Sequence, residues 1–163
     1  MVFGRISIIL AAITALLLGG CATPQPRGIW SPEQLAVLKE ENFVQTARGW
    51  EFTVDDRLLF ATDESQLDAS QTDTIVRIAK RLLAVGIQHA EVEGHTDKTG
   101  TTEYNDQLSK RRADAVAGLL TTNGFAAENV RATGLGERFP VETNASATGR
   151  RENRRVVILL TAP

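Results

Sequence analysis

The sequence is poor in the side chains that build metal centres and disulfide bonds. It contains one cysteine, Cys21, and two histidines, His89 and His95. A single cysteine excludes an intrachain disulfide, and so few soft ligands do not suffice for a structural zinc site. We therefore expect neither a metal nor a cofactor in this protein.

An excess of charge of one sign is also lacking. The formal net charge is -2 at pH 7, whereas nucleic-acid-binding domains usually carry a large positive excess on one face. Nucleic acid is therefore not an expected partner. The hydrophobic share of 42% and the charged share of 23% are ordinary for a globular protein. A length of 163 residues allows one domain with an appendage.

No apolar run is long enough to cross a membrane. Residues 6–18 are apolar or small, and as a helix they would cover about 20 Å, short of a hydrocarbon core of about 30 Å. This run is typical of a signal peptide, and it ends in a sequence that resembles a bacterial lipobox, Leu18-Gly19-Gly20-Cys21. We expect residues 1–20 to be removed and Cys21 to be acylated; the alternative is an uncleaved anchor with an incidental buried cysteine. Ala22, in place of the aspartate that favours inner-membrane retention, indicates the outer membrane, facing the periplasm.

A tether and a short helix follow the cysteine. Residues 21–30 contain two prolines and a glycine, and this segment reaches about 30 Å when extended. The Ser31-Pro32-Glu33-Gln34 sequence supplies a capping box and a proline in the first turn, which predicts a leader helix to about Glu41. Leu35 and Leu38 give this helix only a small apolar face, so we expect marginal docking of the leader segment, residues 31–48.

The remaining residues, 49–163, have the pattern of one α+β domain. Period-two alternation near residues 50–54 and 90–93 predicts strands, and residues 58–60 form another apolar run. Helical periodicity covers about 68–84 and 102–123, and further strands are expected at about 129–133 and 155–161. The predicted fold is a β-α-β-α-β-β sandwich, with a mixed four-stranded sheet and helices on one face.

One arginine lies where an apolar side chain is expected. On a helical projection of residues 102–123, Arg112 falls about 40° from Leu108, within the core stripe. A buried arginine needs an anion, which could be an internal carboxylate or a bound ligand. Asp97, on the preceding loop, carries the complementary charge, and Asn105 lies on the same side of the helix as Arg112. Catalysis by His95 with Asp97 is disfavoured, because the sequence offers no nucleophile elbow and no third metal ligand at a recognisable spacing.

Four motifs resemble the signature of the OmpA-like peptidoglycan-binding domain: Val92-Glu93-Gly94-His95-Thr96-Asp97, Asn105-x-x-Leu108-Ser109-x-x-Arg112-Ala113, Gly134-Leu135-Gly136-Glu137 and Gly149-Arg150-x-x-Asn153-Arg154-Arg155-Val156. The resemblance implies a non-enzymatic protein that binds the diaminopimelate of peptidoglycan. It implies that Asp97 accepts hydrogen bonds from the ligand's ammonium and that Arg112 forks onto its carboxylate. Thr62 and Asp63 match a loop at the rim of this pocket, and Asn105 matches the family's helix asparagine.

The last motif has two interpretations. Asn153, Arg154 and Arg155 match the family, but they can equally cap and support the last strand. The sequence leaves the roles of these three residues open.

The leader segment adds a narrower resemblance. Residues 31–38, 42–43 and 49–52 are similar to the corresponding parts of YfiB-type lipoproteins. That resemblance implies a second partner, a periplasmic repressor protein whose capture releases a diguanylate cyclase and so raises cyclic-di-GMP. The alternative is a purely structural anchor of the peptidoglycan-associated lipoprotein kind.

Overall fold

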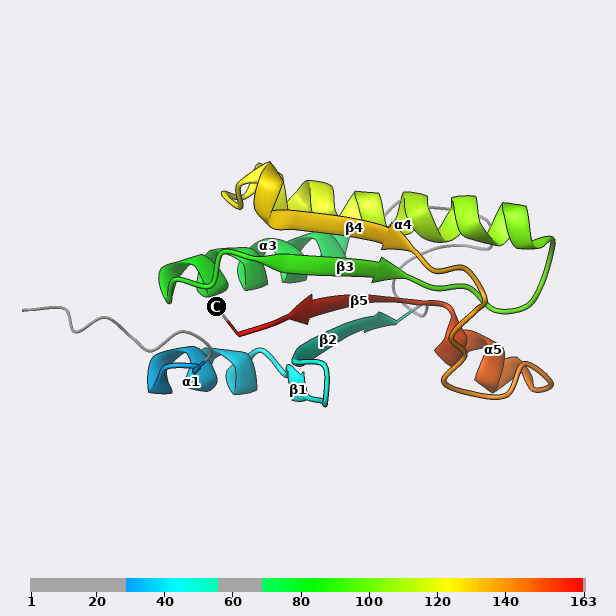
Figure 1. Cartoon of the computed structure of the whole chain (residues 1–163), viewed down its shortest axis with the longest axis horizontal. Coiled ribbons are helices and arrows are strands. Elements are labelled where there is room, and N and C mark those ends of the chain that lie inside the picture. The colour runs from blue at the N-terminus through cyan, green and yellow to red at the C-terminus, as the bar shows by residue number, and fades with distance from the viewer. Residues whose placement is uncertain (1–28, 56–68, 163) are drawn as a thin grey trace, which may run out of the picture.

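The computed structural model describes residues 29–55 and 69–162, and these form one mixed sheet with two long helices on one face (Figure 1). The strand order is β1-β2-β5-β3-β4, in which β3 and β4 are parallel and the other neighbours are antiparallel. The α+β architecture predicted from the sequence is confirmed. Along the chain the elements are α1 (Pro32–Glu40), β1 (Val44–Gln45), β2 (Trp50–Asp55), α3 (Ala69–Ala84), β3 (Ala90–Gly94), α4 (Thr102–Thr122), a 3-10 turn (Ala127–Asn129), β4 (Val130–Gly134), α5 (Ala147–Asn153) and β5 (Arg155–Leu160).

The sheet has five strands, so the expected four were wrong. The additional strand is β1, whose two residues pair antiparallel with the start of β2. A two-residue strand is too short to produce a periodic pattern in the sequence. Gly49 closes the hairpin at a φ of 147°, and a Cβ there would lie 2.3 Å from the carbonyl oxygen of Leu160. The apolar run predicted at 58–60 lies outside the described residues.

Helix α5 is also absent from the predicted order of elements. It begins after Ser146, whose hydroxyl accepts a hydrogen bond from the Gly149 amide at 2.9 Å. Its buried residues are Gly149 and Asn153. Neither belongs to an apolar stripe, which is why helical periodicity gave no signal for this element.

The core lies between the sheet and the helices α3 and α4. Strand β5 is buried from Val156 to Leu160, as its apolar run predicted. Register places Val92 opposite Ile158 on the face toward the helices, and it leaves Glu93 opposite Val157 on the other face. At Gly94 the helix α4 approaches so closely that a Cβ would lie 1.9 Å from the Ser109 carbonyl oxygen. This glycine therefore sets how tightly α4 packs where β3 ends.

The leader helix α1 has the predicted capping box and is docked on the domain. The Ser31 hydroxyl accepts from the Gln34 amide at 3.2 Å, and the Gln34 side chain accepts from the Ser31 amide at 2.9 Å. Leu38 is 0% exposed and Phe43 is 4% exposed, and both belong to the main core. The docking is thus more extensive than the short helix suggested, because the connector after α1 also enters the core.

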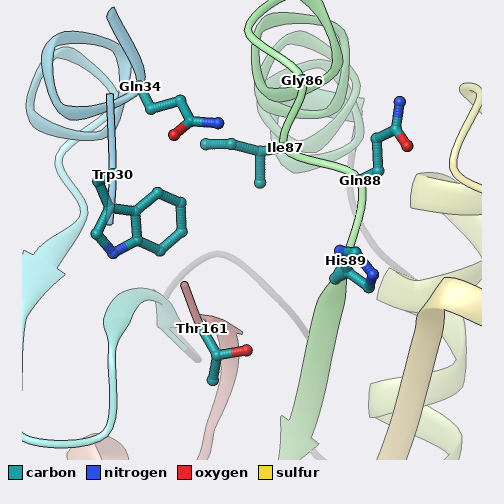
Figure 2. Close-up of a pocket in the computed structure, with 7 residues that line it drawn as sticks. All are labelled: Trp30, Gln34, Gly86, Ile87, Gln88, His89 and Thr161. Atoms are coloured by element: carbon teal, nitrogen blue, oxygen red, sulfur yellow. The ribbon is translucent and has the colours of Figure 1, made fainter. Parts of the chain in front are cut away.

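Polar contacts complete the attachment of the leader segment. The buried carboxylate of Glu41 forms ion pairs with Arg77 and Arg81 of α3, the latter at 2.8 Å. The side-chain amide nitrogen of Gln34 donates to the Val85 carbonyl oxygen at 3.1 Å. Beside this contact lies a pocket of about 240 Å³, into whose space Trp30 and Gln34 project from the leader side (Figure 2). It is lined by Trp30, Gln34, Gly86, Ile87, Gln88, His89 and Thr161.

Within the described ranges, every helix is too short or too polar to cross a bilayer.

Candidate functional site

The candidate site lies where β3 ends and α4 begins, at one end of the sheet (Figure 1). The parallel strands β3 and β4 both point their carboxyl ends there, so the loops that follow them meet. Asp97 lies on the loop between β3 and α4. Thr101 caps the helix, since its hydroxyl accepts from the Tyr104 amide at 3.2 Å.

Arg112 is buried, as its place in the apolar stripe predicted. Its side chain is 2% exposed, and it is the largest among the fully buried side chains of the described residues. Asn105 and Ser109 are buried on the same face of α4. A spacing of four and then three residues aligns these side chains along the helix. Helix α4 therefore carries a polar stripe within its buried face. Its middle member, Ser109, lies in a quoted motif but was not predicted to be a site residue.

Asp97 is buried and held by two hydrogen bonds. Its side chain accepts from the Thr99 amide at 2.7 Å and from the Arg154 guanidinium at 2.7 Å. Burial acts to raise the pKa of Asp97, but the hydrogen bonds from Thr99 and Arg154 outweigh it and hold the pKa below its ordinary value. Asp97 is therefore ionised at neutral pH, and Arg154 is a site residue whose role the sequence left open.

The loop after β4 is attached to the same stripe. The side-chain nitrogen of Asn105 donates to the Glu137 carboxylate, and the Ser109 hydroxyl accepts from the backbone amide of Gly136 at 2.9 Å. The Gly136 carbonyl in turn accepts from the Thr96 amide at 2.9 Å. These bonds place the Gly134-Leu135-Gly136-Glu137 motif against both α4 and the loop that carries Asp97.

Asn153 supports this end of the domain from the other side. Its side-chain oxygen accepts from the amides of Val141 and Glu142, and its nitrogen donates to the Asn144 side chain at 3.1 Å. Asn144 also accepts from the Lys98 amide at 3.1 Å, one residue after Asp97. The Asn153 side chain therefore ties the loop before α5 to the end of that helix.

The structure thus places Asp97 on the loop before α4, Asn105 in the first turn of α4 and Arg112 farther along the same buried face of that helix. The other predicted residues, Thr62, Asp63 and Cys21, lie outside the described residues. Arg154 and Glu137 were not chosen as site residues, although both lie within the motifs quoted above. Only their long-range partners, 57 and 32 residues away, distinguish them.

A buried anionic side chain and a buried cationic side chain, here Asp97 and Arg112, are the groups that a ligand carrying both charges requires. A carboxylate accepts hydrogen bonds from an ammonium, and a guanidinium donates two parallel hydrogen bonds to a carboxylate. Burial strengthens both contacts, because water does not compete for them.

The chain belongs to the OmpA family, whose model matches residues 59–154. Among curated proteins it is 41% identical over 157 residues to the outer-membrane lipoprotein YfiB of Pseudomonas aeruginosa, covering 95% of this chain and 94% of that protein. It is 37% identical over 151 residues to the putative lipoprotein YfiB of Escherichia coli, covering 92% and 93%. The resemblance to YfiB-type lipoproteins and the predicted outer-membrane location are confirmed.

Solved structures agree with this assignment. The cell wall anchor of the type VI secretion system from Pseudomonas aeruginosa superposes with a TM-score of 0.66 at 32% identity. The match covers 85% of this chain and all of that one. The fold of this chain is therefore similar to that of a known cell wall anchor.

Proposed function

We propose that this protein binds peptidoglycan non-covalently through the diaminopimelate of the stem peptide. The observation that carries the proposal is that two oppositely charged side chains, Asp97 on the loop before α4 and Arg112 on α4, are each more than nine-tenths buried. The side-chain terminus of diaminopimelate carries one ammonium and one carboxylate. Asp97 accepts from the ammonium, and Arg112 forks onto the carboxylate.

The Asp97 carboxylate has room for a ligand in addition to its present partners. Each oxygen has two lone-pair sites, and one bond to Thr99 and one to Arg154 occupy only part of them. Arg154 keeps Asp97 ionised and oriented before the ligand arrives. Asn105, Thr62 and Asp63 form the rest of the proposed pocket. The match to the OmpA family and the likenesses to a peptidoglycan-binding protein and to a cell wall anchor support peptidoglycan as the ligand.

Sedimentation with purified sacculi tests the proposal on the full-length protein in detergent. Charge-assisted hydrogen bonds contribute roughly 1.5 to 3 kcal/mol each, so Asp97→Ala or Arg112→Ala should weaken binding about tenfold or more. Arg112→Lys should also weaken it, since an ammonium cannot fork onto a carboxylate.

Lys110→Ala is the matched control, because Lys110 lies on the same helix and its exposed side chain pairs only with Asp114 within the described residues. Circular dichroism and thermal unfolding establish that each variant is folded. Wild-type binding by folded Asp97→Ala and Arg112→Ala variants would refute the proposal and leave the internal ion pair as the reason for the buried arginine.

The proposed function includes a lipid anchor at Cys21. Residues 1–20 are removed, two or more acyl chains hold the protein at the outer membrane, and residues 21–30 form the tether. Cys21→Ser should accumulate as a precursor and lose labelling by an alkyne palmitate analogue. Normal processing of that variant would contradict the anchor.

A second function, capture of a periplasmic repressor that controls cyclic-di-GMP, is supported by the YfiB relatives and by the leader segment. A partner that selects an undocked leader would gain residues 31–48 as additional reach, about 60 Å when extended. Leu38→Pro, which removes a buried side chain and breaks α1, should raise both wall association and cyclic-di-GMP. Lys39→Ala, exposed on the same helix, is the control. A stably expressed Leu38→Pro variant with unchanged cyclic-di-GMP favours the purely structural anchor.

A further inference from the structure

A second pocket opens on the sheet face opposite α3 and α4. Its volume is about 400 Å³, and strands β2, β3 and β5 form its floor. The loop before α5 and the last turn of that helix form its wall. The lining residues are Arg48, Glu51, Thr53, Glu93, His95, Val141, Glu152, Arg155 and Val157.

Arg155 contributes a cation that forms no ion pair with a carboxylate of residues 29–55 or 69–162. Its guanidinium donates to the carbonyl oxygens of Asn153 and Phe139, each at 3.3 Å. Among the described residues, no carboxylate lies within ion-pair distance of it. Burial lowers the pKa of Arg155, and the nearby charges of Glu93 and Glu51 offset this only in part. The remaining N–H groups of the guanidinium are donors for an anion.

Glu93 and His95 contribute buried polar atoms that have no hydrogen-bond partner within the part of the chain that the structure describes. Arg48 donates to one oxygen of Glu93 at 2.6 Å, whereas the other oxygen, Oε2, is buried and has no hydrogen bond. His95 is 3% exposed, and its Nδ1 also has no hydrogen bond. The His95 Nε2 lies 3.9 Å from Glu93 Oε2, too far for a hydrogen bond. Buried polar atoms without partners are rare and mark places where a ligand or water binds.

The imidazole of His95 is uncharged. Burial, followed by the positive charges of Arg155 and Arg48, lowers the pKa of His95 to about 3. A neutral imidazole offers one donor and one acceptor. The pocket therefore combines the Arg155 guanidinium, which can donate to an anion, the Glu93 Oε2 oxygen, which can accept from a cation, and the neutral His95 imidazole, which can donate or accept.

We infer that this pocket binds a small amino acid, free or as an exposed zwitterionic end, with its carboxylate on Arg155 and its ammonium on Glu93. His95 completes the polar contacts between the two charged groups. Val141 and Val157 give the wall and floor an apolar part, which suits a side chain as small as that of alanine. A pure anion would be repelled by Glu93, and a pure cation by Arg155.

This site is separate from the proposed peptidoglycan pocket. None of its lining residues is Asp97, Arg112 or Asn105, and Gly94, next to Glu93, faces α4 on the opposite side of the sheet. Occupancy of the second pocket is therefore expected to survive Arg112→Ala. Failure of peptidoglycan binding and failure of amino-acid binding are distinguishable outcomes.

The test is an NMR titration of the full-length, ¹⁵N-labelled protein in detergent micelles. The probes are D-alanine, L-alanine, acetate and methylammonium, each added to a final concentration of about 20 mM. At least one enantiomer of alanine should shift the backbone amide resonances of Thr53, His95 and Val157. The amide resonances of Asn105 and Gly136 should stay unchanged. Acetate and methylammonium should bind at least about tenfold more weakly, since each lacks one charged contact.

Variants assign the contacts. Arg155→Gln and Glu93→Gln should each weaken alanine binding about tenfold or more, whereas Glu152→Gln, an exposed residue on the same wall, should leave it unchanged. Backbone spectra verify that each variant is folded. The inference is overturned if alanine causes no shift at these amides, if acetate alone binds as well as alanine, or if the shifts occur only around Asn105 and Gly136.

Discussion

Replacing Leu38 by alanine should lower the stability of the whole domain, not merely release the leader helix. Leu38 is fully buried and belongs to the same core as Ile75 and Leu82 of α3. A buried Leu→Ala substitution costs about 2 to 5 kcal/mol, because contacts are lost and a cavity remains. The connector after α1 enters that core through Phe43 and joins the sheet through β1. Loss of Leu38 is therefore expected to weaken one cooperative unit.

Urea unfolding followed by tryptophan fluorescence measures this effect. Trp50 is buried in the core, and Trp30 lines the pocket next to Gln34 of α1. With a slope of about 2 kcal/mol per M, a loss of about 3 kcal/mol lowers the midpoint by about 1.5 M. Leu35→Ala is the matched control, since Leu35 lies on the same helix but is only partly buried, and it should cost clearly less.

The reasoning would be refuted by an unchanged free energy of unfolding in Leu38→Ala. In that case the leader would be detached in solution, and its packing would contribute nothing to the domain. A biphasic transition, in which Trp30 changes before Trp50, would instead place the leader in a cooperative unit of its own.

Three further predictions concern the domain. The pKa of His95 is about 3 in the folded protein, against an ordinary value of 6.5. Below pH 6.5 the unfolded chain therefore binds a proton at His95 that the folded protein does not, and stability should fall as the pH drops. His95→Gln should reduce this slope by up to about 1.4 kcal/mol per pH unit in denaturation experiments. Gly94→Ala should destabilise the domain by about 1 to 3 kcal/mol or more in thermal unfolding, because its Cβ meets the Ser109 carbonyl, whereas Gly118→Ala on the open side of α4 should be neutral or slightly stabilising. The lowered pKa of Asp97 keeps its carboxylate ionised above the ordinary value of 3.8, so sacculus binding should stay constant from pH 7 to about pH 4.5, and a decline beginning near pH 6 would contradict this assignment.

The elements with strong local signals were those that the sequence predicted well. The capping box at Ser31 and Gln34 located the start of α1, and the periodic stripe of α4 located both its ends and its buried arginine. Strand β1 and helix α5 were missed because each is short and owes its conformation to its partners. Val44 and Gln45 become a strand only by pairing with β2, and the buried Asn153 side chain is held by bonds to four groups of the preceding loop.

The site could be predicted only as far as single residues reveal their own environment. Arg112 is conspicuous because a charge interrupts an apolar stripe. Arg154 lies in an ordinary basic cluster, and nothing local indicates that it pairs with Asp97, 57 residues earlier. The sequence analysis considered only Arg112 as the arginine complementary to Asp97, whereas the structure pairs Asp97 with Arg154. Long-range pairs of this kind depend on topology, which periodicity does not encode.

The position of α1 has a mechanical consequence for a protein that links a membrane to a wall. Tension would enter the domain at residue 29 and leave through the other end of the sheet, where the loop from β3 to α4 lies (Figure 1). Helix α1 is then pulled from its own end and peels away turn by turn, so its contacts break in sequence under a small force. Strands β2, β5 and β3 are paired along their length, so their hydrogen bonds share the load. Without load the leader and the domain are expected to unfold as one unit, but under a force applied at residue 29 the geometry loads α1 first, so the leader would yield and lengthen the link before the paired strands give way, which makes α1 a force-limiting element.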